Sequence, residues 1–218
     1  PDWPEFRGRD LVTLMPGLGF HLLAFDGATS EGVLAVQVPR LRHLPRRPRI
    51  VTITVGGNDL LSYFGIEARD GERAAEHLRR RLRRILEACC ALVGPQGCVL
   101  VGNIYDPTDG TGGIPGSEFP RWGASMHLLE LFNRTIAEVT QEFPVELVDI
   151  HSHFLGHGVR AQDETFIHYH PEDPTVWYTQ LIEPNARGAH EIRRCFYKAF
   201  LRTPLARSLG EAAGAERG

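Results

Sequence analysis

Apolar residues gather along the chain in four short runs that have strand character. These runs cover residues 20–25, 50–55, 99–104 and 145–150. Each of them is followed or closed by Gly, Asn or Asp, residues that commonly end strands and open turns. The pattern therefore predicts four strands separated by longer connections.

Between the later runs, apolar residues recur at helical spacing. One stripe, from Ala75 to Val93, is stopped by Gly94-Pro95, and a second, from Leu128 to Val139, ends shortly before Pro144. A third helix is expected to begin near Pro184-Asn185 and to bury Ala189, Ile192, Phe196 and Ala199 or Phe200. Strands that alternate with helices predict an α/β fold with a mainly parallel sheet covered on both faces, a three-layer α/β/α sandwich.

In such a sheet, ligands bind beyond the carboxyl ends of the strands. The residues that follow the predicted strands are therefore the candidates for chemistry: 26–30, 56–59, 106–108 and 151–158. Residues 108–122 are rich in Gly, Pro, Thr and Ser and have no periodicity. We interpret them as a long loop over the crevice.

The second run leads directly into Gly56-Gly57-Asn58-Asp59. A side-chain amide at the end of a strand is an uncharged double donor, suited to an oxygen that becomes negative as a carbonyl turns tetrahedral. The same four residues are also good turn formers, so the motif alone leaves a plain turn equally open. Asp59 and Asp106 are expected to fix turns and cap helices.

Read in order, the motifs resemble the SGNH/GDSL hydrolase superfamily over nearly the full chain. The segment from Phe25 to Leu34 looks like the family's glycine block, in which Gly27 matches the backbone donor. Residues 56–59 look like its asparagine block, with Asn58 as the side-chain donor. The resemblance implies a flavodoxin-like three-layer fold and an oxyanion pocket for ester chemistry.

Two departures from the family pattern bear on catalysis. No Gly-Asp-Ser occurs, and the stretch that stands where it is expected, residues 1–19, holds no serine. We therefore expect the first strand and the nucleophile to lie upstream of the given residues. The last block, usually Asp-x-x-His, has Gln180 in place of the aspartate and Glu183 in place of the histidine. A glutamate with a pKa of about 4.3 is a poor base at neutral pH unless burial raises that pKa.

Another histidine is the alternative base. His157 lies on a glycine-flanked loop after the fourth run, although a loop histidine bonded to backbone is the commoner case. His190 falls inside the last predicted helix and is expected to be structural. His151 and His153, on alternate positions of a strand, together with Asp149 and His157, are a weaker candidate for a metal site. We expect no metal and no cofactor.

Composition limits the class of protein and its partners. With 218 residues and 42% hydrophobic content, the chain fits one domain over residues 1–203, followed by a flexible tail at 204–218. A net charge of −3, and arginines on the solvated face of an amphipathic helix, predict no nucleic-acid partner. No apolar run approaches the roughly 18 residues of a membrane span. The four cysteines lack metal or redox spacing and are interpreted as small apolar residues. Oligomeric state is left open.

Three functions compete on this evidence. The first is a serine ester hydrolase that acts on a small-molecule ester through an acyl-enzyme, with Gly27 and Asn58 stabilising the oxyanion. The second is a catalytically inactive domain on the same scaffold that binds a small molecule or carbohydrate, favoured by Glu183. The third is a nucleotide or phosphate binder with the Gly56-Gly57 turn at a helix N-terminus. It lacks the Lys-Ser/Thr pair or the longer glycine fingerprint that such sites use.

Overall fold

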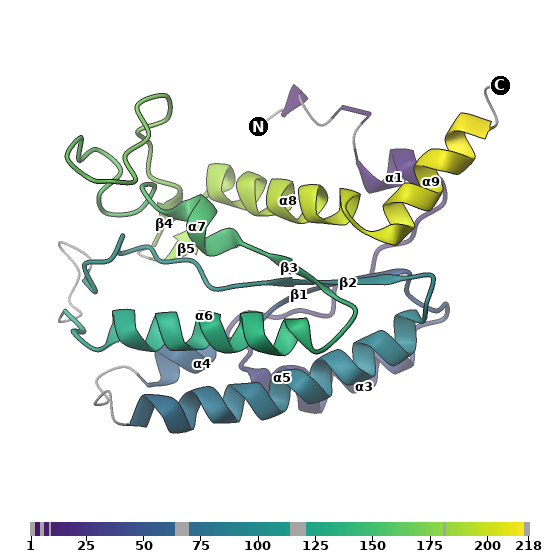
Figure 1. Cartoon of the computed structure of the whole chain (residues 1–218), viewed down its shortest axis with the longest axis horizontal. Helices are drawn as coiled ribbons and strands as arrows, with labels where there is room; N and C mark the ends of the chain where they lie inside the picture. The colour runs from purple at the N-terminus through teal and green to yellow at the C-terminus, as the bar shows by residue number, and fades with distance from the viewer. Residues whose placement is uncertain are drawn as a thin grey trace.

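Three parallel strands form the central sheet of the computed structural model (Figure 1). They are β1 (Ile50–Thr54), β2 (Cys98–Gly102) and β3 (Glu146–Val148), in the order β1-β2-β3. The last three predicted strands and the α/β class are confirmed. The structure describes residues 3–4, 7–8, 10–63, 70–113, 121–180 and 182–215.

The three strands differ in how completely they are covered. All five residues of β2 are buried, as expected for a parallel strand between two helical layers. In β1, by contrast, Thr52 and Thr54 are exposed. Among the described residues β1 pairs only with β2, so one edge of the sheet ends at β1.

One face of the sheet carries the long helices α5 (Gly71–Val93) and α6 (Ser125–Gln141), as Figure 1 shows. Their predicted apolar stripes are buried, with Leu82, Ile85 and Ile136 fully enclosed. The same core cluster takes in residues from the π-helical turn η2 (Val33–Gln37), from α3 (Val38–Arg42) and from α4 (Gly57–Ser62). The short helix α2 (Ser30–Gly32) directly precedes η2.

The opposite face is covered mainly by α8 (Ala186–Leu201), which Asn185 caps through its side chain. The predicted start of this helix is confirmed, and Ala199 and Phe200 are buried as expected. Ala189 is exposed, however, because His190 and Glu191 occupy the buried face of the first turns. The short helices α1 (Leu11–Leu14) and α7 (Ile150–Phe154) lie on the same side of the sheet (Figure 1).

The first predicted strand is wrong. Residues 18–25 form no regular structure, and Phe20 and Leu22 are 85% and 72% exposed. A strand needs a neighbour to satisfy its backbone groups, and no described segment pairs with this run. Its apolar pattern indicates a strand, but the hydrogen-bonding partner that would complete it is not among the described residues.

The tail also differs from expectation. Residues 204–215 form helix α9 (Pro204–Ala215) rather than a flexible end. Leu205 is buried in the core cluster beneath α8, and Ala206 and Leu209 pack against that cluster. The apolar side of this short helix therefore extends the core, which accounts for its order. Within the described residues, every helix is too short or too polar to cross a bilayer.

Candidate active site

The chain turns sharply where β1 ends. Gly56 has a φ of +108°, a conformation that favours glycine. A side chain at this position would also approach Ile104 to 3.1 Å. The two glycines thus let α4 begin immediately after the strand, which puts Asn58 in the first turn of that helix at the carboxyl end of the sheet.

Asn58 contacts the glycine block directly. Its side-chain Nδ2 donates a hydrogen bond of 3.1 Å to the carbonyl of Ala28, the residue after Gly27. Gly27 has a φ of +76° and is exposed. The two predicted oxyanion donors therefore belong to turns that touch each other, although they are about 30 residues apart in sequence.

A second contact locks the same two turns together. The backbone N–H and the hydroxyl of Ser30 both donate to the carboxylate of Asp59, at 2.7 and 2.5 Å. Ser30 is fully buried and Asp59 is 5% exposed. The Ser30 hydroxyl is thus committed to a carboxylate, and Asp59 fixes a turn, as its sequence context predicts.

Glu183 lies at the same end of the sheet. It is exposed on β5 (Glu183–Pro184), which pairs antiparallel with β4 (Tyr178–Thr179). Gln180 occupies the connecting turn with a φ of +45°. Burial, together with the charge of Glu183, raises the pKa of Tyr105 to about 12. Tyr105 follows β2, and its ring centroid lies 5.6 Å from that of Tyr178 on β4, so the β4-β5 hairpin meets the carboxyl end of the central strand.

The surroundings of His157 are those of a packing residue. Its ring is stacked between Trp177 and His170, with centroids 3.4 and 4.5 Å away. Nδ1 lies 3.1 Å from the carbonyl of Thr175, which can only accept, so this nitrogen carries the proton. The side chain is 3% exposed, and burial lowers its pKa to about 4. A ring so enclosed and so weakly basic is poorly suited to general-base catalysis at neutral pH.

The other late histidines also have structural partners. His151 and His153 lie on helix α7 rather than on a strand, because Asp149 accepts from the Ser152 N–H and caps that helix. Two residues apart on a helix, they do not share a face, so the premise of the metal alternative is wrong. Among the described residues no group of three or more His, Cys, Asp and Glu side chains is placed to hold a metal ion. His190 is buried and stacks on Trp3.

Sequence reasoning missed one charged cluster on α8. The carboxylate of Glu191, 1% exposed, lies 2.7 Å from Nε2 of His153 and 3.1 Å from Arg187. Burial opposes its ionisation, but these partners and Arg194 outweigh burial and lower the pKa of Glu191. Nothing in the local pattern distinguishes this glutamate from a surface one. Its burial depends on α7, which is distant in sequence.

Two aspartates fix the loop that follows β2. Asp106 accepts from the backbone N–H groups of Thr108 and Gly110 and so fixes its own turn, as predicted. Asp109, with a φ of +46°, accepts from three N–H groups of residues 156, 158 and 160, each at 2.9 Å. The predicted loop at 108–122 is described only in part, since residues 114–120 lie outside the described residues.

Comparison with known proteins identifies the family. Residues 1–188 match the model of the GDSL-like lipase/acylhydrolase family. The chain belongs to that family. The predicted relationship of this GDSL-like domain to lipases and esterases is therefore confirmed. At the level of the family, its function is ester hydrolysis.

Solved structures agree on the fold of this GDSL-like chain. The extracellular lipase of Streptomyces rimosus is 18% identical, covers 88% of this chain and 87% of its own, and has a TM-score of 0.61. Phospholipase A1 of Streptomyces albidoflavus NA297 is 18% identical over 79% of this chain and 77% of its own, with a TM-score of 0.55. A lipase from a goat rumen metagenome is 18% identical over 78% and 73%, also with a TM-score of 0.55. No curated protein sequence matches the chain.

Proposed function

We propose that this GDSL-like domain hydrolyses small-molecule esters through an acyl-enzyme, with Gly27 and Asn58 stabilising the oxyanion. The observation that carries the proposal is the hydrogen bond from Asn58 to Ala28, which brings the asparagine turn and the glycine turn together at the carboxyl end of the sheet. One amide proton of Asn58 makes this bond. The other, and the backbone N–H of Gly27, are the donors that the mechanism requires.

The remaining chemistry needs a nucleophile and a base. The serine is assigned to sequence upstream of the given residues, because the nearest serine of the site, Ser30, is buried against Asp59. Attack of a serine hydroxyl on the ester carbonyl forms a tetrahedral oxyanion, which two preorganised donors stabilise more than they stabilise the planar ester. Collapse of that intermediate expels the alcohol, and water then releases the acid.

We assign Glu183 as the general base that accepts the proton of the serine hydroxyl. It stands where the family has histidine, it is exposed, and its hairpin contacts Tyr105 at the carboxyl end of β2. Because an exposed carboxylate is a weak base at neutral pH, we expect turnover with Glu183 as the base to be slow. His157, the other predicted base, is enclosed by rings and by the Thr175 carbonyl. The carboxylate would accept the serine proton during attack and return it to the leaving alcohol.

Asn58→Ala tests the oxyanion pocket. In a form of the chain extended upstream through a Gly-Asp-Ser block, and assayed with a short p-nitrophenyl ester, we expect kcat to fall about a hundredfold. Ser62→Ala is the matched control, since this residue lies on the same helix and its hydroxyl donates only to the Asp59 carbonyl. An active extended chain that is indifferent to Asn58→Ala would contradict the mechanism.

Glu183→Gln tests the base in the same assay. The amide keeps the size of the side chain but cannot take a proton, so we expect kcat to fall about a hundredfold or more. Glu164→Gln, on an exposed position of the 155–177 loop, serves as the control. Retention of the parent kcat by Glu183→Gln would remove Glu183 from the mechanism.

A catalytically inactive binding domain is the second candidate. It is favoured because neither predicted base position offers an accessible imidazole. Glu183 stands where the family has histidine, and His157 is only 3% exposed. Labelling with a fluorophosphonate separates the two, because it requires an activated serine. The hydrolase predicts that the extended chain is labelled and the 218-residue chain is not, whereas the binding domain predicts no label on either.

A further inference from the structure

A row of basic side chains follows one face of helix α5. Its members are His77, Arg80, Arg81 and Arg84, and together they line a pocket of about 310 Å³. Residues three and four positions apart lie one above the other on a helix. At a rise of 1.5 Å per residue, this α5 row extends about 10 Å along the helix axis.

Ion pairs distinguish the α5 row from the other arginines of the helix. Arg79 and Arg83 reach across to glutamates of helix α6. Arg80 and Arg84 are exposed and form no ion pair with any residue that the structure describes. They lie four positions apart, a spacing at which like charges repel each other and destabilise a helix. The α5 row therefore holds positive charge that the described part of the chain does not neutralise.

The sequence around the α5 row adds to this positive charge. The chain as a whole carries a net charge of −3, yet residues 77–86 contain five arginines and no acidic residue. Residues 32–57 also contain five arginines and no acidic residue. Helix α3 of that segment lies beside α5 (Figure 1) and contributes to the same core. The neighbouring segment thus reinforces the positive potential along α5 instead of cancelling it.

Arg81 connects the α5 row to the candidate active site. Its guanidinium lies 2.5 Å from the carboxylate of Glu31, in the glycine block, and 3.7 Å from that of Asp59, in the asparagine block. The Glu31 side chain is 71% exposed, so this pair is weak and an anion in the pocket would compete for Arg81. Because Arg81 also supports the two turns of the site, Arg80 and Arg84 are the residues to replace in a test.

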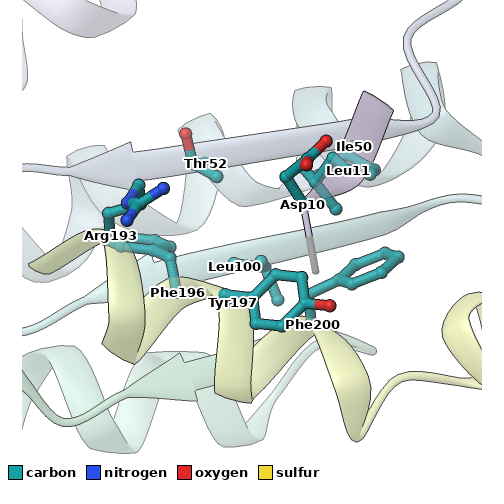
Figure 2. Close-up of a pocket in the computed structure, with 9 residues that line it drawn as sticks. All are labelled: Asp10, Leu11, Ile50, Thr52, Leu100, Arg193, Phe196, Tyr197 and Phe200. Atoms are coloured by element: carbon teal, nitrogen blue, oxygen red, sulfur yellow. The ribbon is translucent and has the colours of Figure 1, made fainter. Parts of the chain in front are cut away.

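A second pocket differs from the first in both place and chemistry. It has a volume of about 390 Å³ and lies between the sheet and α8, on the face opposite α5 (Figure 2). Its walls are mainly apolar and aromatic side chains, among them Ile50, Leu100 and Phe200. An anion there would exchange water for largely apolar surroundings, which is costly. The pocket on α5 is therefore the better place for an anionic ligand.

We propose that the pocket lined by the α5 row binds a phosphate group. A guanidinium donates two parallel N–H bonds to phosphate oxygens, and the row presents three guanidiniums and an imidazole on one face. A phosphate group carries about two negative charges and three acceptor oxygens, so it uses more of these donors than a carboxylate does. The phosphate can belong to a soluble molecule or to a lipid headgroup. The inference goes beyond the proposed function and does not depend on ester hydrolysis.

Inorganic tripolyphosphate tests the soluble source by isothermal titration calorimetry on the 218-residue chain. We expect it to bind, and Arg80→Gln/Arg84→Gln to bind it about tenfold more weakly or worse, because charge-assisted bonds are lost. The matched control is Arg134→Gln/Lys198→Gln, at exposed positions of α6 and α8. It changes the net charge equally and should bind as the parent does. Thermal melts establish that both double variants fold.

Vesicles test the lipid source with the same variants. The chain is sedimented with vesicles of phosphatidic acid in phosphatidylcholine, and with phosphatidylcholine alone. A lipid ligand predicts sedimentation only with phosphatidic acid, lost in Arg80→Gln/Arg84→Gln and kept in the control. Binding to tripolyphosphate without binding to vesicles assigns the site to a soluble phosphate compound, and either result supports the proposal.

Three outcomes would overturn the proposal. They are no binding to either probe, equal loss of binding in the two double variants, and binding of duplex DNA that tripolyphosphate does not displace. The second outcome would be a general effect of net charge, and the third would make α5 a nucleic-acid surface. None of these outcomes bears on the Asn58 assay, so the failure of this proposal and the failure of the proposed function are distinguishable.

Discussion

At the scale of single residues, one buried hydrogen bond helps to hold the turns of the candidate site together. The fully buried Ser30 hydroxyl donates to Asp59, and bonds to a charged group contribute about 1.5–3 kcal/mol. We expect Ser30→Ala to lower the free energy of unfolding by about 2 kcal/mol in urea denaturation. Ser208→Ala, at an exposed helical position, should change it by less than about 0.5 kcal/mol. Equal effects would show that the Ser30 contact adds nothing beyond a surface bond.

The pH dependence of stability is also argued from one residue. Burial lowers the pKa of His157 from 6.5 to about 4 in the folded state, so between these values the unfolded chain takes up a proton that the folded chain does not. Stability is therefore fully present above about pH 6.5 and falls as the pH drops toward 4, by about 3 kcal/mol in total.

His157→Phe should remove this dependence while keeping the ring stack. Comparing urea unfolding at pH 7 and pH 4.5, we expect the variant to lose about 2 kcal/mol less than the parent. His168→Gln, at an exposed position, is the control and should behave as the parent does. If His157→Phe shows the same acid loss as the parent, the titrating group lies elsewhere.

At the scale of secondary-structure elements, we predict that helix α9 is part of the cooperative fold. Its residue Leu205 is 5% exposed and belongs to the core cluster beneath α8. Leu205→Ala leaves a cavity there and should lower the free energy of unfolding by about 2–3 kcal/mol. Leu201→Ala, 48% exposed on α8, should cost much less. Equal and small effects would mean that α9 is not part of the cooperative fold.

The elements also show what sequence patterns can predict. Helical periodicity found α5 and α6 because one face of each meets the same core. The pattern failed at residues 20–25, since a strand depends on a neighbouring chain that periodicity does not report. It failed again at α9, where a short apolar stripe is ordered by packing against α8.

At the scale of the whole molecule, the roles of Gly27 and Asn58 stay predictions. Both residues come after apolar runs, but the run before Gly27 forms no strand, so sheet topology accounts only for the place of Asn58 at the carboxyl end of β1. Their turns do touch. The enclosure of His157 was not predictable, because it depends on Trp177 and His170 in a loop without periodicity. The burial of Glu191 depends in the same way on a distant helix.

Asp109 accepts hydrogen bonds from three backbone N–H groups and so joins the turn after β2 to the loop after α7. These two segments come from different parts of the chain, yet they share one carboxylate. A single substitution at Asp109 would therefore loosen both loops at once.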